Sequence, residues 1–359
     1  MTLFPNINSK IIHSSEISTY TGTSSTASEA QFIPMTSGEK IEVTNELKYD
    51  KDISDTQIER EKYIQKSPAH EHKVTSGDTL SKIARKYGVS LEALYAENPG
   101  FNKDTKLSLG QSVKIPASRK IVNVKNLTDV AKAMGISVDF VKQWKKIEDG
   151  PNFPENSFHN KAYYDNVGVL TIGIGHAIQD DIARQELIKK YGDLELTNAE
   201  VCDLFASDLL KAEENIVAII GQNNYDNLPT PMKEALLDMV FNKGNAIIKD
   251  SEGLAWCLKN GKYEAAINKF TNIKSMSTGK EMSGLAKRRL LDISIATKMF
   301  DKVPQSNINT AQAVYDRGVD KLYQECLATG KNFENQLIGY NQDIQKYLGD
   351  RIKINYCTQ

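Results

Sequence analysis

The stretch that decides the fold runs from Tyr163 to His176 and reads YYDNVGVLTIGIGH. Its Asp-Asn-Val-Gly segment at 165–168 predicts a turn, because Asp and Asn side chains bond their own backbone and Gly accepts a positive φ. Residues 169–174 then predict a short strand, since they are rich in β-branched side chains. Gly173 and Gly175 offer little to pack, which favours a site where another group approaches the backbone closely.

A helix with an acidic residue at its end is predicted upstream of this strand. Ser137 can cap the helix, and its apolar side chains recur at helical spacing over residues 140–147. Glu148 follows at the helix end, before the terminating Asp-Gly-Pro segment at 149–151. A carboxyl group partly shielded from water at that place suits the role of a general acid.

Three side chains therefore form a candidate catalytic set, namely Glu148, Asp165 and Thr171. Two carboxylates and a hydroxyl beside a glycine-lined strand suit the cleavage of a glycosidic bond. One acid protonates the leaving oxygen, while the other helps a water molecule to attack. Positioned proton transfer of this kind contributes roughly 10²–10⁴ in rate.

This region, residues 137–300, resembles the phage-type lysozymes of glycoside hydrolase family 24. The resemblance is carried by Glu148-x-Gly150 and by the spacing Asp-x5-Thr-x-Gly-x-Gly-His from Asp165 to His176. Further matching segments follow downstream: Leu204-Phe205-x-x-Asp208, Thr230-Pro231, Phe241-Asn242-Lys243-Gly244, Tyr263-Glu264-Ala265-Ala266 and Gly284-Leu285-Ala286-Lys287-Arg288-Arg289. The resemblance implies an α+β fold, with a mainly helical two-lobed domain and a small β-sheet.

The resemblance also implies roles for the three candidate residues. Glu148 would be the general acid, Asp165 would position or activate the water, and Thr171 would hold that water. The bond cut would be the β-1,4 link between N-acetylmuramic acid and N-acetylglucosamine, with inversion of the anomeric centre. Inverting glycosidases hold their two carboxyl groups about 6.5–9.5 Å apart.

Four more residues are expected around this set. His176 is expected to pair with Asp208, as a structural partner rather than as a proton shuttle. Asn242 and Arg288 are expected to face the substrate, with a place on a solvated helix face as the alternative for Arg288. No cofactor is expected, and the four widely spaced cysteines, without a CxxC pair or an adjacent His, argue against a metal site.

The number of residues between the two carboxylates departs from the family pattern. Sixteen residues, 149–164, separate Glu148 from Asp165. Glu155 lies nearer the usual spacing, but it follows Pro154 in a polar loop with no helix to hold it. Glu148 is therefore preferred as the acid, and Glu155 stays the alternative. The extra loop is expected to overhang the cleft or to touch substrate.

A small module of strand–helix–helix–strand order is predicted at residues 71–117. A strand candidate at 72–75 is closed by a Ser-Gly-Asp turn, and two helical segments follow, separated at Gly88. A Leu-Gly-Gln turn at 109–111 then leads into a closing strand. These residues resemble the LysM module, which implies binding to peptidoglycan and other glycans that contain N-acetylglucosamine.

In that family the sugar lies in a groove between two loops of the module. The substrate-binding positions carried over to this chain are Gly77, Asp78, Thr79, Asn98 and Pro99. Glycine and proline would keep the groove shallow and rigid, while the Asp and Asn side chains would offer polar atoms. The alternative is that these residues only make turns.

Residues 118–136 are predicted as a helical connector into the catalytic region. Residues 127–137 echo residues 80–90 of the module, so a degenerate second module is the alternative. No closing strand follows this echo, which favours the connector.

The two ends of the chain carry weaker signals. Residues 1–70 are rich in Ser, Thr, Glu and Lys with few large apolar side chains, which predicts a disordered tail or a segment that orders on a partner. Residues 301–359 show helical periodicity. They are predicted as a helical extension that packs on the catalytic lobe or contacts a carrier.

Composition argues against several classes of function. A net charge of −1 over 359 residues disfavours nucleic acid as the main partner. No run approaches the ~18 apolar residues of a membrane helix, so no membrane insertion is expected, and no secretory signal is recognised at the N-terminus. The four cysteines form no CxxC pair, which predicts free thiols from a reducing compartment.

Together these features predict a muramidase that its LysM-like module targets to the bacterial wall, either an antibacterial effector or a phage lysin. The alternative is an inactive baseplate or adaptor protein that has a lysozyme fold and binds peptidoglycan. Synthesis in the cytoplasm without a signal peptide would require delivery to the periplasm by a holin, a phage tail or a contractile secretion machine. The predicted partners are therefore peptidoglycan, such a carrier and a cognate inhibitor.

Overall fold

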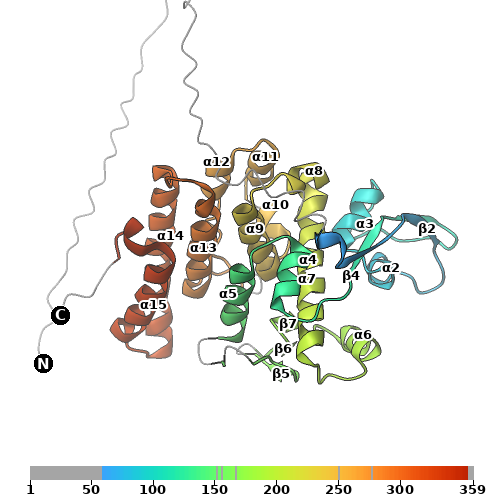
Figure 1. Cartoon of the computed structure of the whole chain (residues 1–359), viewed down its shortest axis with the longest axis horizontal. Helices are drawn as coiled ribbons and strands as arrows, with labels where there is room; N and C mark the ends of the chain where they lie inside the picture. The colour runs from blue at the N-terminus through green and yellow to red at the C-terminus, as the bar shows by residue number, and fades with distance from the viewer. Residues whose placement is uncertain are drawn as a thin grey trace, which may run out of the picture. The chain divides into compact units, whose positions relative to one another are not determined.

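The computed structural model of the chain describes residues 59–150, 153–154, 157–165, 168–249, 251–275 and 278–354. All of these residues belong to one compact unit. Within these ranges the chain is mainly helical with three small antiparallel sheets, so the predicted α+β fold class is confirmed (Figure 1). The part of the predicted N-terminal segment before residue 59 lies outside the described residues. Every helix in the described part of the chain is too short or too polar to span a lipid bilayer.

The strand–helix–helix–strand order predicted for residues 71–117 is the order that the structure has. β2 (His70–Lys73) pairs antiparallel with β3 (Ser112–Ile115), and α2 (Leu80–Tyr87) and α3 (Leu91–Glu97) lie between them in the chain. This βααβ module has a core of its own, made of eight buried apolar side chains: Val74, Leu80, Ile83, Ala84, Val89, Leu94, Val113 and Ile115.

Two boundaries differ from the prediction. β1 (Ile64–Ser67) pairs antiparallel with β4 (Ser118–Ile121). The segment predicted to be disordered up to residue 70 therefore contains a paired strand, and the connector predicted as helical at 118–136 begins with its partner. Three of the four β1 side chains are exposed, so β1 shows no apolar alternation that would predict a strand. Its pairing depends on a partner distant in the sequence.

The residues before β1 are tied to α7 (Asn198–Ile220) by a buried cluster of charges. The Glu213 carboxylate is fully buried and accepts hydrogen bonds from Arg60, at 2.6 Å, and from Arg119. Burial opposes ionisation of this carboxyl group, but the two guanidinium groups outweigh burial and lower the pKa of Glu213. Because a buried charge needs its partners, the cluster holds the segments on both sides of the βααβ module against α7.

The similarity between residues 80–90 and 127–137 corresponds to the same type of connection between two helices. α4 (Leu127–Met134) ends at Gly135 with a φ of 64°, as α2 ends at Gly88 with a φ of 66°. In both cases a serine then caps the next helix, Ser137 for α5 and Ser90 for α3. α4 packs against α5 and α7, so it belongs to the helical part of the catalytic region.

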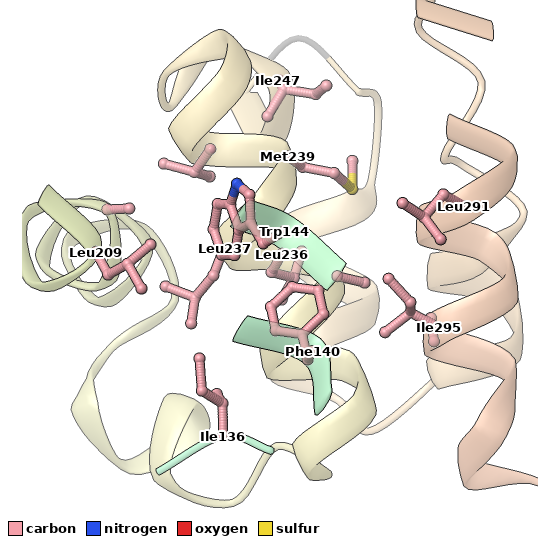
Figure 2. Close-up of a cluster of buried hydrophobic side chains, with 14 of the residues drawn as sticks. Ile136, Phe140, Trp144, Leu209, Leu236, Leu237, Met239, Ile247, Leu291 and Ile295 are labelled. Carbon is pink, nitrogen blue, oxygen red and sulfur yellow. The ribbon is translucent and has the colours of Figure 1, made fainter. Parts of the chain in front are cut away.

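Helix α5 (Val138–Asp149) is anchored in the larger core. Its Trp144 side chain is fully buried and lies edge-on to the rings of Phe205 and Phe241, at 5.5 Å and 5.2 Å between ring centres. Figure 2 shows this ring among apolar side chains of α5 itself and of the neighbouring helices α7 and α9: Phe140, Leu209, Leu236, Leu237 and Met239. Because of this anchor, the end of α5, where Glu148 lies, has a defined place.

The rest of the region predicted to be catalytic consists of one small sheet and eight further helices among the described residues. The antiparallel sheet has the order β5–β6–β7, with β5 (Tyr163–Tyr164), β6 (Leu170–Ile172) and β7 (His176–Ala177). The helices are α6 (Asp181–Tyr191), α7, α8 (Gln222–Asp226), α9 (Thr230–Lys243), α10 (Ala246–Lys249), α11 (Leu254–Lys259), α12 (Tyr263–Ile267) and α13 (Ser283–Ala296), and the short 3₁₀ helix η1 (Thr297–Met299) follows.

The C-terminal extension packs on the catalytic region through α13. It consists of α14 (Gln305–Thr329), α15 (Phe333–Leu348) and the short 3₁₀ helix η2 (Gly349–Arg351), and both long helices lie beside α13 (Figure 1). A Cβ atom added at Gly318 on α14 would lie 2.7 Å from the Cβ of Ala286 on α13 and would overlap the Tyr340 hydroxyl of α15. Of the two roles predicted for this extension, packing on the catalytic lobe is therefore the one observed.

Replacing Gly318 with Ala is expected to lower the free energy of unfolding by roughly 1–3 kcal/mol, because the added methyl group overlaps α13 and α15. Gly339→Ala on α15 is the matched control, since an added Cβ there meets nothing within 4 Å. Without a clash, alanine in a helix raises stability by about 0.4–1 kcal/mol. Urea unfolding of both variants is the measurement, and equal effects would contradict the three-helix contact at Gly318.

Candidate active site

Glu148 lies one residue before the end of α5, and its side chain meets the glycine run after β6. Its Oε1 atom accepts a hydrogen bond of 2.7 Å from Nη2 of Arg288, and its side chain is 16% exposed. A Cβ atom added at Gly175 would lie 2.7 Å from Glu148 Oε2, and φ at Gly175 is 70°. The structure therefore brings the predicted acid against the stretch that carries Asp165 and Thr171, and only glycine leaves it that room.

Asp165 and Thr171 lie on the hairpin formed by β5 and β6. The Asp165 N–H donates to the Val169 carbonyl at 2.9 Å, and Asp165 Oδ1 accepts from the Val169 N–H at 2.8 Å. Thr171 is buried, faces Tyr163 in the register of the sheet, and donates its hydroxyl to the Val169 carbonyl at 3.1 Å. These bonds hold both side chains in place, and the Thr171 oxygen keeps lone pairs that can accept a bond from water.

Tyr163 is a member of the site that sequence reasoning missed. Burial raises the pKa of the Tyr163 hydroxyl. The negative charges of three nearby carboxylates, those of Asp149, Glu148 and Asp165, raise it further. The phenol therefore lies within electrostatic reach of both candidate catalytic groups. In the sequence, only its place directly before the Tyr164-Asp165 pair could have pointed to Tyr163 as part of the site.

The predicted pair of His176 and Asp208 is formed. Nδ1 of His176 lies 2.6 Å from Asp208 Oδ2, and both side chains are largely buried. Burial opposes ionisation of Asp208, but the positive charges of His176 and Lys211 outweigh it and lower the pKa of Asp208. The pair ties β7 to α7, which is the structural role expected for it.

Arg288 lies against the candidate acid and not on a solvated helix face. It is 11% exposed and donates from Nε and Nη2 to the two carboxylate oxygens of Asp238 on α9, at 2.9 Å and 2.8 Å. Asp238 is 1% exposed, and sequence reasoning missed it because a lone Asp in an apolar helix stripe carries no motif. Asn242 lies four residues further along α9.

The long link between the two carboxylates is anchored at the end of α5. Lys145 and Asp149 form a buried ion pair of 2.5 Å. The His159 ring stacks between the rings of Phe153 and Tyr163, at 3.9 Å and 4.3 Å between ring centres. Burial lowers the pKa of His159, which favours a neutral ring in this stack. The link therefore connects the helix end beside Glu148 with the tyrosine beside Asp165.

Two families match the chain. Residues 155–291 match the family model of phage lysozyme, and residues 72–116 match that of the LysM domain. The chain thus joins a LysM-like module to a domain similar to phage lysozymes. Both resemblances seen in the sequence are confirmed, in the same order along the chain. A comparison with curated proteins found no match.

The lysozyme match covers Asp165, Thr171, His176 and Asp208, but it begins after Glu148. It also spans Glu155, the alternative acid, which lies outside the described residues. The choice of Glu148 as the acid in this lysozyme-like domain therefore depends on its contacts with Arg288 and Gly175.

The polar side chains predicted to bind sugar in the LysM-like module make bonds within the module. Asp78 accepts from the Thr75 N–H at 2.7 Å and lies 2.8 Å from Nε2 of His72, and these bonds lower its pKa. The Asn98 amide donates to the carbonyls of Leu94 and Lys114 and accepts from the Lys114 N–H. These contacts favour the turn-forming alternative for both side chains.

The other three positions of the two loops serve the fold locally. Thr79 caps α2 by accepting a hydrogen bond from the Lys82 N–H. Gly77 takes a φ of 85°, and a Cβ there would meet nothing within 4 Å. Pro99 follows Asn98 at the end of α3. Backbone groups and the Thr79 hydroxyl are thus what these loops can offer to a glycan.

Gly175→Ala is expected to reduce hydrolysis of peptidoglycan at least about tenfold, because the new methyl group would displace the Glu148 carboxyl group from its place. Gly192→Ala is the matched control: φ there is 88°, yet a Cβ meets nothing within 4 Å. Both variants carry backbone strain of about 1–3 kcal/mol, so only the contact differs. Release of soluble fragments from purified peptidoglycan is the measurement, and equal rates for both variants would contradict the contact.

Asp208→Asn is expected to lower the free energy of unfolding at pH 7 by roughly 1–3 kcal/mol, since it removes a charged partner from His176. The folded-state pKa of Asp208 is depressed, so its contribution is present above the unfolded value of about 3.9 and is lost as pH falls through the folded value. Unfolding curves at several pH values should show the difference shrinking below about pH 4. A difference independent of pH would contradict the ion pair.

Proposed function

We propose that the protein is a peptidoglycan hydrolase, an N-acetylmuramidase that the LysM-like module holds on the bacterial wall. The bond cut is the β-1,4 link between N-acetylmuramic acid and N-acetylglucosamine. The observation that supports this best is the contact of Glu148 with Gly175 and Arg288, beside the hairpin of Asp165 and Thr171 in a lysozyme-like domain.

The proposed mechanism is a single displacement with inversion at the anomeric carbon. The Glu148 carboxyl group gives its proton to the glycosidic oxygen as the bond to the anomeric carbon breaks. Asp165 takes a proton from a water molecule, whose oxygen attacks that carbon from the opposite face. Thr171 accepts a hydrogen bond from the same water and fixes its direction of approach. No cofactor and no metal ion takes part in this scheme.

The supporting residues keep these groups in place. The pair of His176 and Asp208 holds β7 on α7 and so supports the turn at Gly175. Arg288 orients Glu148, and because its guanidinium is already bonded to two carboxylates, orientation accounts for it better than capture of a muropeptide carboxylate. Asn242 is proposed to contact the glycan.

We propose that the LysM-like module binds N-acetylglucosamine-containing strands through the loops at Gly77–Thr79 and Asn98–Pro99. Asp78 and Asn98 shape these loops, which then present backbone groups to the sugar. Arg60 and Arg119, on the segments that flank the βααβ module, are bonded to Glu213 of α7, so glycan binding and cleavage would occur within one compact unit.

The biological setting proposed is attack on a bacterial wall by an effector or a phage lysin that is delivered to the periplasm. A carrier and a cognate inhibitor belong to this proposal. The second candidate function is an inactive adaptor with a lysozyme fold that binds peptidoglycan. Both functions share the LysM-like module, so activity of the Glu148 site separates them.

Glu148→Gln and Asp165→Asn are each expected to reduce the rate of glycan cleavage by roughly 10²–10⁴, because each removes a proton-transfer group. Glu155→Gln is the matched control and should keep the wild-type rate. Purified peptidoglycan is the substrate, and new reducing ends are counted. The anomeric configuration of the first product, read by NMR, is expected to be inverted.

Each outcome decides between the alternatives. Wild-type cleavage by Glu148→Gln would refute Glu148 as the acid, and loss of activity in Glu155→Gln would assign that role to Glu155. Absence of cleavage by the wild-type chain, with peptidoglycan binding retained, would favour the adaptor.

A further inference from the structure

Arg288 stands between two carboxylates that belong to different helices. Two of its nitrogens, Nε and Nη2, donate to both oxygens of Asp238, at 2.9 Å and 2.8 Å. The Nη2 group also donates to Glu148 Oε1 at 2.7 Å. The same guanidinium thus joins the candidate acid Glu148, at the end of α5, to the Asp238 carboxylate of α9.

The two-oxygen contact with Asp238 determines the plane of the guanidinium. An arginine side chain has many rotamers, and a paired contact with a carboxylate selects one geometry. Once that plane is set, the remaining proton of Nη2 points in one direction, and Glu148 Oε1 lies there. Asp238 therefore orients the acid through Arg288, although it is 1% exposed and lies beyond reach of solvent.

The charge of Asp238 has a second consequence. A general acid must hold its proton until the glycosidic oxygen takes it, and an uncompensated cation at 2.7 Å would favour loss of that proton. Asp238 is bonded to the same guanidinium, and its negative charge offsets the positive charge of Arg288. Arg288 can then position Glu148 through a hydrogen bond, while its positive charge favours loss of the Glu148 proton less strongly.

The charged groups around Asp238 are consistent with an ionised carboxylate. From α13 it faces Arg288 and, at 4.0 Å, Nη2 of Arg289. Burial opposes ionisation, but the charge of Arg288 outweighs it, so the pKa of Asp238 is lowered. Asp292, 3.0 Å from Arg289, has its pKa raised well above the ordinary value by burial, and the Tyr347 hydroxyl of α15 is uncharged at neutral pH. Of these two carboxyl groups, Asp238 is thus the one whose charged form its partners favour.

We propose that Asp238 is a positioning residue of the hydrolase: it holds Arg288 in the orientation that places Glu148 and offsets the charge of Arg288 beside that acid. This inference depends on the proposed function, since it assigns Asp238 to the reaction in which Glu148 is the acid. It adds a residue from outside the motif that carries the resemblance to lysozymes.

The test is Asp238→Asn in the full-length chain, with initial rates on purified peptidoglycan over a series of pH values. The amide keeps the size of the side chain and one acceptor oxygen but removes the charge. We expect kcat to fall about tenfold or more with KM changed less than about twofold. We also expect the alkaline limb of the pH–rate profile to move about one pH unit toward acid. Wild-type kcat together with a wild-type alkaline limb would overturn the proposal.

Asp343→Asn is the matched control. Asp343 pairs at 2.7 Å with Lys287, the neighbour of Arg288 in the chain, but on the partly exposed side of α13. Its pH–rate profile and kcat should equal those of the wild type. An equal shift in both variants would mean that any charge change near α13 has this effect, which would also overturn the assignment of Asp238.

If the single variant does not fold, the test uses the double variant Asp238→Asn with Arg288→Gln. It removes one buried charge of each sign, so the net charge of the buried cluster is unchanged, and two amides of similar size can bond each other. We expect kcat to stay low because the acid is no longer oriented, while the alkaline limb returns toward its wild-type position. A wild-type kcat in this variant would refute the positioning role.

Glu148→Gln, measured beside these variants, separates this inference from the proposed function. Full activity of Glu148→Gln would refute the proposed function, and Asp238 would then have no acid to position. An inactive Glu148→Gln with an unchanged Asp238→Asn would refute the role of Asp238 alone.

Discussion

The guanidinium of Arg288 makes the contacts on which the arrangement of the lysozyme-like region depends. From α13 it reaches Asp238 on α9 and Glu148 at the end of α5, three segments far apart in the sequence. A charge so poorly exposed needs partners of opposite sign, so these three helices can pack in few other ways without leaving a charge unpaired. The C-terminal helices α14 and α15 lie on α13 and keep the arginine-bearing helix in place.

The other half of the site is held by backbone conformation rather than by charge. Gly175 brings the chain against Glu148, and any side chain there would occupy the place of the carboxyl group. His176, the next residue, is tied to α7 by Asp208. The long link after α5 returns to the same hairpin through the stack of His159 and Tyr163, so part of its extra length packs beside the candidate catalytic groups.

Prediction from the sequence succeeded where the signal was local. The spacing from Asp165 to His176, the caps at Ser90 and Ser137, and the helical periodicity of the extension all lie within short stretches. It failed for β1, whose exposed side chains give no alternation, and for Asp238, which is one acid within an apolar helix. In both cases the partner lies far away in the chain, and pairing at long range leaves no periodic trace.

By itself the sequence determined the α+β class, the two family resemblances and the residues from which a catalytic set can be drawn, because turn chemistry, helix caps and motif spacing are properties of neighbouring residues. Only the tertiary structure decided what those residues contact. It placed Arg288 on Glu148 and not in solvent, turned Asp78 and Asn98 inward to bond the LysM-like module, and packed the extension on α13. The reason is physical: a buried charge or polar atom must find its partner wherever packing brings one, and that partner is seldom a neighbour in sequence.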